Sequence, residues 1–250
     1  MSAARTYKKV VHDRIGEYWA TWLPGDLIRV GDCGPLNGIT FKNVDTLAHY
    51  QISFEAEPGR KWTKLDCSSS SGVEHSGSAA ASAIVGQAEF AVKFTRENSV
   101  LFAAADVEGQ SLRNRGDILR QLKQKNFPSD HAVVSDVLVA KSLTVMVAGK
   151  TKETVILHLA VPVGTPIGPA EIASAVGHSG GASLEFAIVG NANMTPLYKL
   201  VWPPRGFWRT LQAGFVDFLS RFTFGSVGVE DDVVYVDFDA AYAGSEGEDE

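Results

Sequence analysis

The longest regular pattern in the chain alternates apolar and polar residues from Ala132 to Val161. The odd positions form an apolar face: Val133, Val137, Val139, Leu143, Val145, Val147, Val155, Leu157, Leu159 and Val161. Polar residues fall on the other face: Asp136, Ser142, Thr144, Thr154 and His158. Because successive strand residues point to opposite faces, this pattern predicts a long hairpin with one dry face and the charged GKTKE as its tip. The first arm far exceeds the usual length of about 5–6 residues, so it must curl, bend at a bulge or belong to an extended sheet.

A second long strand region is the stretch from Ser68 to Phe94. Its first half is a run of serine, glycine and alanine, and its second half alternates with apolar residues at even positions: Ile84, Ala88, Phe90, Val92 and Phe94. The period of two predicts a strand in the second half. The small residues of the first half suit a segment that folds compactly in one state and extends in another.

The N-terminal segment from Ala3 to Trp22 carries aromatic and aliphatic residues at helical spacings of three and four. Basic residues lie between them: Arg5, Lys8, Lys9 and Arg14. We predict an amphipathic helix with a basic side, ended by Pro24 and Gly25. Its apolar stripe suits packing on a core, and its basic side suits residence on an anionic membrane surface.

The rest of the chain predicts short elements. Between 26 and 54 we expect strands and tight turns, with Asn37-Gly38 as a hairpin signal, the strand pattern continuing through Tyr50, Ile52 and Phe54, and NVDTLAHY as an optional helix. Helices are expected in RGDILRQLKQKNF and RGFWRTLQAGFVDFLSRF, and strands in SVLFAAADV, ASLEFAIVG, PLYKLVW and VVYVDF. The fold class is therefore α+β, with a twisted antiparallel sheet, long amphipathic hairpins and a few peripheral helices.

Charge separates the chain into a body and a tail. Residues 229–250 hold nine of the 29 acidic residues and no Lys or Arg. The remaining 20 acids and all 23 basic residues lie in 1–228, which gives that part a net charge of +3. We expect one α+β body over 1–228 and an acidic tail over 229–250 that either solubilises the chain or masks the basic body.

Several classes of protein are disfavoured by composition. No apolar window is long enough for a membrane-spanning helix, and the N-terminal segment lacks the apolar core of a secretory signal, so we expect a cytoplasmic protein. Only Cys33 and Cys67 are present, with no metal-ligand spacing, and no phosphate-binding loop occurs. An isoelectric point of about 5.5 disfavours nucleic acid. We expect no catalytic residue, cofactor or metal.

One short motif, GHSGG at 177–181, fits the nucleophile turn G-x-S-x-G. That turn needs a strand before the serine, a helix after it and a histidine further along the chain. Here a helical-looking segment precedes Ser179, a strand follows it, and every histidine lies before it. We therefore expect a surface turn.

Alternation over two long regions suits strands that cross a bilayer, which need about 9–11 residues each and neighbours that close a barrel. Two hairpins cannot close a barrel, so a pore requires a homo-oligomer in which each copy donates its hairpins.

The order of these features resembles the pore-forming domain of gasdermins, and in size their short bacterial or fungal-type members, over residues 3–203. The likeness lies in the basic N-terminal helix, GSAAASAIVGQAEFAVKF, RGDILRQLKQ, AVVSDVLVAKSLTVMV with its return strand, and SLEFAIVGNANMTPLYKLVW. Short bacterial members carry a lipid-modified cysteine near the N-terminus, whereas the first cysteine here is Cys33.

The resemblance implies a soluble monomer that moves to the inner face of the plasma membrane and perforates it in cell death or defence. Activation would follow removal of the acidic tail, for example by a protease acting within TFGSVGVEDD, or binding of a partner. Anionic lipid would contact Arg5, Lys8, Lys9 and Arg14. The inserting residues would be Ser68, Ile84, Phe90, Phe94, Val137, Val139, Leu143, Val145, Val155, Leu157 and Leu159. Two alternatives remain open: a soluble β-rich binding or interaction module without catalytic activity, and a hydrolase that uses Ser179.

Overall fold

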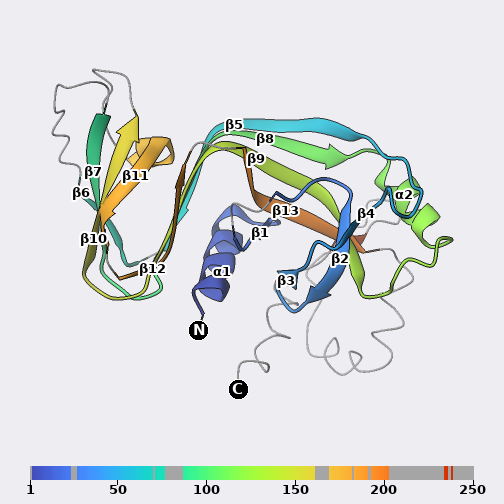
Figure 1. Cartoon of the computed structure of the whole chain (residues 1–250), viewed down its shortest axis with the longest axis horizontal. Helices are drawn as coiled ribbons and strands as arrows, with labels where there is room; N and C mark the ends of the chain where they lie inside the picture. Colours follow the sequence, from blue (N-terminus) through green and yellow to red (C-terminus); the bar gives the residue numbers. More distant parts are fainter. Residues whose placement is uncertain are drawn as a thin grey trace. The chain divides into compact units, whose positions relative to one another are not determined.

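The structure, a computed structural model, describes residues 2–23, 27–69, 71–76, 87–160, 169–181, 183–190, 193–202, 234–235 and 238. Antiparallel strands make up most of it, with two α-helices and one 3₁₀ helix in the described residues (Figure 1). The predicted α+β class, with antiparallel sheet dominant, is confirmed. The expected helix at 205–222 lies outside the described residues.

The elements follow one another in a strand-rich order. In chain order they are α1 (Ala3–Ile15), β1 (Trp19–Ala20), β2 (Asp32–Asn37), β3 (Thr40–Phe41), β4 (Asp45–Thr46), β5 (Ala56–Ser68), β6 (Val73–Ser76), β7 (Gln87–Phe94), β8 (Val100–Leu112), α2 (Arg115–Leu122), β9 (His131–Ala148), β10 (Glu153–Ala160), η1 (Pro169–Ser174), β11 (Ala175–Gly180), β12 (Leu184–Gly190), β13 (Met194–Trp202) and β14 (Val234–Tyr235).

The strands form two sheets. A large sheet has the order β1-β13-β9-β2-β3, with β12 and β8 also paired to β9, β5 to β8, β4 to β2 and β14 to β13. A smaller sheet has the order β11-β10-β7-β6. Contacts divide the chain into two compact units: residues 1–27, 60–109 and 138–197 form unit 1, and residues 28–59, 110–137 and 198–250 form unit 2.

Unit 1 has two hydrophobic clusters that meet the strands β8 and β9 from different sides. One cluster joins α1 to these strands through Tyr7, Phe102 and Val145. The other joins the small sheet to the same strands through Phe90 and Met146. Neighbouring residues on β8 and β9 thus belong to different clusters, as the period of two requires. The order of packing in unit 1 is helix, large sheet, small sheet.

Unit 2 holds the short strands predicted from the turn signals. β2 and β3 pair with Asn37 opposite Thr40, which confirms the hairpin, and Gly38 in its loop has a φ of +51°. Glycine tolerates this left-handed conformation because it has no Cβ. α2 confirms the predicted short helix and buries its apolar face: Ile118, Leu119 and Leu122.

Helix α1 ends earlier than the apolar pattern indicated. It stops at Ile15, where Gly16 takes a φ of +70° and donates its backbone N–H to the carbonyl of His12 at 2.8 Å. This closing bond satisfies a carbonyl that the last turn would leave open. Trp19 then enters strand β1, which pairs with β13.

The segment between 47 and 68 also differs from its prediction. Residues 47–51 are turns and neither a helix nor a strand, and the extended structure begins at Ala56 as β5. The 13-residue strand β5 was missed because its residues are mostly exposed and do not alternate, so burial left no pattern in the sequence. Its pairing with β8 holds it in place.

The long hairpin is the main correction to the predicted topology. Its two arms are strands, β9 and β10, separated by turn and bend residues at 149–152. They belong to different sheets, however: β9 pairs with β12, and β10 pairs with β7 and β11 (Figure 1). In the described state the chain therefore crosses from one sheet to the other at residues 149–152.

Candidate functional site

The small sheet has one dry face and one wet face. β7 and β10 pair over eight residues without a break, and their register places Val155 opposite Val92 and Leu157 opposite Phe90. The apolar face is buried completely: Phe90, Val92, Phe94, Val155, Leu157 and Leu159 are each at most 1% exposed. The other face carries exposed or partly exposed residues: Glu89, Ala91, Lys93, Thr154, Ile156 and His158. Five of the predicted inserting residues thus lie on one face: Phe90, Phe94, Val155, Leu157 and Leu159.

Strand β9 is buried on both faces over most of its length, with only Lys141 exposed, in contrast to its prediction. Among its predicted inserting residues, Val137, Leu143 and Val145 are buried and Val139 is partly buried. The expected polar face is also dry, since Thr144 is fully buried and donates its hydroxyl to the Ile172 carbonyl at 3.0 Å. Both faces of β9 in unit 1 are covered because the cluster under α1 packs on one face and the small sheet packs on the other.

The odd positions of β9 do not form one continuous face. Leu138 and Ala140 belong to the cluster under α1 together with Leu143 and Val145. The residues that face this cluster therefore change from even to odd positions between Ala140 and Leu143. One extra residue in a strand produces this change, as a β-bulge does.

The remaining inserting residues are placed as follows. Ser68 is the last residue of β5, in the large sheet, and is partly buried. Ile84 lies outside the described residues. The stretch from Ser68 to Phe94 is thus not one strand: β6 and β7 pair antiparallel within the small sheet, with Val73 opposite Phe94.

The four cations of α1 divide into two pairs. Arg5 is 9% exposed and Lys8 is 5% exposed, so the predicted basic side is partly turned inward. Burial lowers the pKa of Lys8 from 10.5 to about 8, because a desolvated ammonium group is less stable than in water. Lys9 reaches solvent and pairs with Asp13 at 3.0 Å, and Arg14 is exposed.

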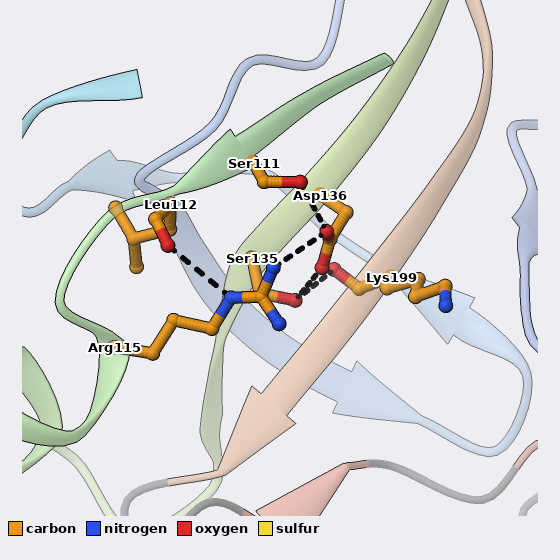
Figure 2. A network of polar contacts seen from close by, with 6 residues as sticks. All are labelled: Ser111, Leu112, Arg115, Ser135, Asp136 and Lys199. Atoms are coloured by element: carbon orange, nitrogen blue, oxygen red, sulfur yellow. Dashed lines mark hydrogen bonds and ion pairs between the residues drawn. The ribbon is translucent and has the colours of Figure 1, made fainter. Parts of the chain in front are cut away.

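A buried polar network joins α2 to the strands of unit 2 (Figure 2). The Asp136 carboxylate accepts hydrogen bonds from Ser111 Oγ at 2.7 Å, Arg115 Nη2 at 2.8 Å and Ser135 Oγ at 2.6 Å. Ser135 Oγ also lies 3.5 Å from the Lys199 carbonyl. Both carboxylate oxygens accept hydrogen bonds, which stabilises the buried charge of Asp136. We therefore interpret this network as structural.

A second polar cluster lies on the wet face of the small sheet. His158 Nε2 is 3.2 Å from Ser179 Oγ, and His158 Nδ1 is 3.6 Å from the Glu89 carboxylate. The three residues come from neighbouring strands, β7, β10 and β11. Ser179 lies within strand β11 and not in the expected surface turn. No local sequence pattern indicates this cluster, because only the register of three strands brings it together.

The two cysteines and the potential metal ligands among the described residues form no site. Burial raises the pKa of the Cys67 thiol to about 12 and raises the pKa of Cys33 even further, which disfavours the reactive thiolate form. Both are free cysteines. The described residues contain no group of three or more His, Cys, Asp or Glu side chains placed to hold a metal ion.

Fold and site together define an α+β protein of antiparallel sheets in which the apolar face of the small sheet packs on β8 and β9 within unit 1. No protein-family model matches the chain, and no curated protein matches it. Among the described helices, none has the length and apolar character needed to span a membrane.

Proposed function

We propose that this protein perforates membranes by oligomerising and donating strands to a β-barrel pore. The observation that carries the proposal is the unbroken pairing of β7 with β10, in which one face is apolar and buried and the other is largely polar, with Ala91 and Ile156 as its apolar members. A barrel wall has the same division, with lipid on one side and water on the other. The apolar face now lies against the large sheet and would turn to lipid in the pore.

The topology supports a specific rearrangement of β9 and β10. These consecutive strands are separated by only four residues, 149–152, but each is paired with one part of the segment 175–190: β12 lies along β9, and β11 lies along β10. Release of this segment frees one edge on each strand. The freed edges then allow β9 and β10 to pair with each other as an antiparallel hairpin, while β7 stays on the other edge of β10.

The loop length determines whether this hairpin has a continuous apolar face. A five-residue loop at 149–153 sets Val145 opposite Leu157 and Leu143 opposite Leu159. A four-residue loop would shift the register by one and place these apolar residues on opposite faces. The five-residue loop is therefore part of the proposal. Because Glu153 joins this loop, seven residues of β10 remain in the hairpin, whereas a bilayer strand needs about 9–11. The proposal therefore also requires residues beyond Ala160, where the sequence pattern continues with Val161.

Contact with anionic lipid would begin at Lys9 and Arg14, whose side chains reach solvent. Arg5 and Lys8 would join only after α1 leaves its packing in unit 1. Surface charges are screened beyond about 8 Å at physiological ionic strength, so initial binding should weaken as salt is added.

Two cysteine pairs that share Ile156 test the rearrangement. Ile156 is the partner of Ser179 on β11 and of Ala91 on β7. Cα atoms of directly opposed residues lie about 4.5–5.5 Å apart, within the range that a disulfide spans. The pair Ile156→Cys with Ser179→Cys locks β10 to the segment that must leave, and the pair Ile156→Cys with Ala91→Cys locks β10 to the strand that stays.

The readout is dye leakage from vesicles of phosphatidylserine and phosphatidylcholine after cleavage of the chain near Gly225. We expect the first lock to block leakage until reductant is added, and the second lock to leave leakage unchanged. Equal leakage from both oxidised locks would refute the release of 175–190. Sealed vesicles with cleaved unmodified protein would refute pore formation itself and favour a β-rich binding module.

A further inference from the structure

We propose that Ser179 is a nucleophile, with His158 as its general base and Glu89 as the positioning residue, and that this site cleaves small, activated esters. The inference concerns the wet face of the small sheet and does not rest on pore formation. It takes up the GHSGG motif, which the proposed pore does not explain.

The first support is the geometry of the two histidine nitrogens. Nε2 lies 3.2 Å from the Ser179 hydroxyl oxygen, and Nδ1 lies 3.6 Å from the Glu89 carboxylate. A carboxylate beside Nδ1 favours the tautomer with hydrogen on Nδ1, which leaves the lone pair of Nε2 to accept the serine proton. This is the arrangement of serine, base and orienting acid that recurs on unrelated folds in different chain orders.

The second support is that the three residues are held by regular pairing and not by mobile chain ends. His158 is directly opposite Glu89 in the pairing of β10 with β7, and Ile156 is directly opposite Ser179 in the pairing of β10 with β11. The three strands therefore place the side chains on one face. The missing histidine after Ser179 is no obstacle, because a sheet supplies the base from a neighbouring strand.

The reaction uses water as its second substrate. As Ser179 Oγ bonds to the acyl carbon, its proton passes to His158 Nε2, and the bond from the acyl carbon to the leaving oxygen breaks. The leaving alcohol takes up that proton. Water then attacks the acyl-serine, again giving a proton to Nε2, and the serine oxygen leaves and regains it. The products are one carboxylic acid and one alcohol.

The open face limits the substrate and the rate. The side chain of Glu89 is 63% exposed and that of His158 is 36% exposed, so the described residues form no deep wall that could hold a large acyl group. Small esters with good leaving groups reach the serine on this open face and need no such wall. A positioned base contributes about 10²–10⁴-fold, so we expect slow turnover of p-nitrophenyl acetate.

The test is covalent labelling of the full chain with a fluorophosphonate, read by intact mass and peptide mapping. Attack by Ser179 Oγ forms the oxygen–phosphorus bond, and fluoride leaves. We expect one label at Ser179, none in Ser179→Ala, and labelling about 10²-fold slower in His158→Gln. Exposed Ser53 is the matched control, and Ser53→Ala should label as the unmodified chain does.

The role of Glu89 is tested by a conservative rescue. Glu89→Gln removes the charge that orients His158 and should slow labelling and p-nitrophenyl acetate hydrolysis about tenfold, and Glu89→Asp should restore most of both rates. An unlabelled chain, or equal labelling of Ser179→Ala, would overturn the nucleophile. Unchanged rates in His158→Gln would overturn the general base.

Discussion

Strands β9 and β10 have the same alternating sequence pattern but different surroundings. β10 is dry on one face and wet on the other, and it lies in a sheet of four strands. β9 is dry on both faces over residues 143–148, because α1 and the small sheet cover it from different sides in unit 1. Alternation therefore identifies a strand without saying how many of its faces are covered.

The difference has a consequence for the proposed pore. A strand with one wet face can move from the core of a soluble form to a barrel wall and keep its polar face in water. A strand buried on both faces must first lose one cover. In unit 1 that cover is the apolar face of the small sheet itself, so moving β10 also exposes one side of β9.

A lysine introduced into each strand gives the largest expected difference between the buried and the wet face. Met146→Lys puts an ammonium group on the side of β9 that faces the small sheet, where Met146 is fully buried. An unpaired buried charge costs about 3–5 kcal/mol. Ile156→Lys puts the same group on the wet face of β10 and should change the free energy of unfolding by about 1 kcal/mol or less.

Urea denaturation of both variants measures this difference. If Met146→Lys is as stable as Ile156→Lys, the small sheet does not cover β9 and the layered arrangement of unit 1 is wrong. Soluble expression gives a second readout, because a loss of about 3–5 kcal/mol is a large part of the stability of an ordinary domain.

The two elements that cover β9, α1 and the small sheet, differ in polarity. The pH dependence of the free energy of unfolding tests that difference. The small sheet covers β9 with apolar side chains, whereas α1 buries Lys8 in unit 1. The pKa of Lys8 is about 8 in the folded chain and 10.5 in the reference state. Below pH 8 both states hold the proton. Between pH 8 and 10.5 only the unfolded state keeps it, so stability rises with pH by about 3 kcal/mol in total.

Lys8→Met should abolish this rise and raise the free energy of unfolding at pH 7. The matched control is Lys9→Met, because Lys9 is exposed and pairs with Asp13, and such pairs contribute about 0.5 kcal/mol or less. Subtracting each variant from the unmodified chain at every pH isolates the lysine from other titrating groups. A rise that persists in Lys8→Met would show that α1 does not bury this amine.

Secondary structure could be predicted from the sequence where one-sided burial produces a periodic pattern of apolar residues. The alternation of Phe90 and Phe94 predicted β7, and Asn37-Gly38 predicted a hairpin that forms. Prediction failed for β5, whose exposed residues carry no period, and for the pairing of β9 with β10, since local alternation does not specify a partner strand. The cluster of Glu89, His158 and Ser179 was missed for the same reason: residues far apart in sequence meet only through the register of three strands.

The smallest expected effect concerns Thr144, a buried polar residue of β9 in unit 1. Thr144 is fully buried and donates to the Ile172 carbonyl at 3.0 Å, so Thr144→Val should cost about 1 kcal/mol by removing a buried hydrogen bond. Thr195 on β13 is equally buried, but its hydroxyl has no hydrogen-bond partner among the described residues. Thr195→Val should therefore leave stability unchanged or raise it.

The difference in unfolding stability between these two variants shows whether the Thr144 hydrogen bond stabilises the folded chain. The substitutions have the same shape and are both in buried strands, so changes in packing and strand propensity largely cancel. Urea midpoints should fall for Thr144→Val and hold or rise for Thr195→Val. If both midpoints rise, the Thr144 hydrogen bond does not stabilise the described state. The polar side chain would then be explained by a second state in which this face of β9 meets water, as in the proposed pore lumen.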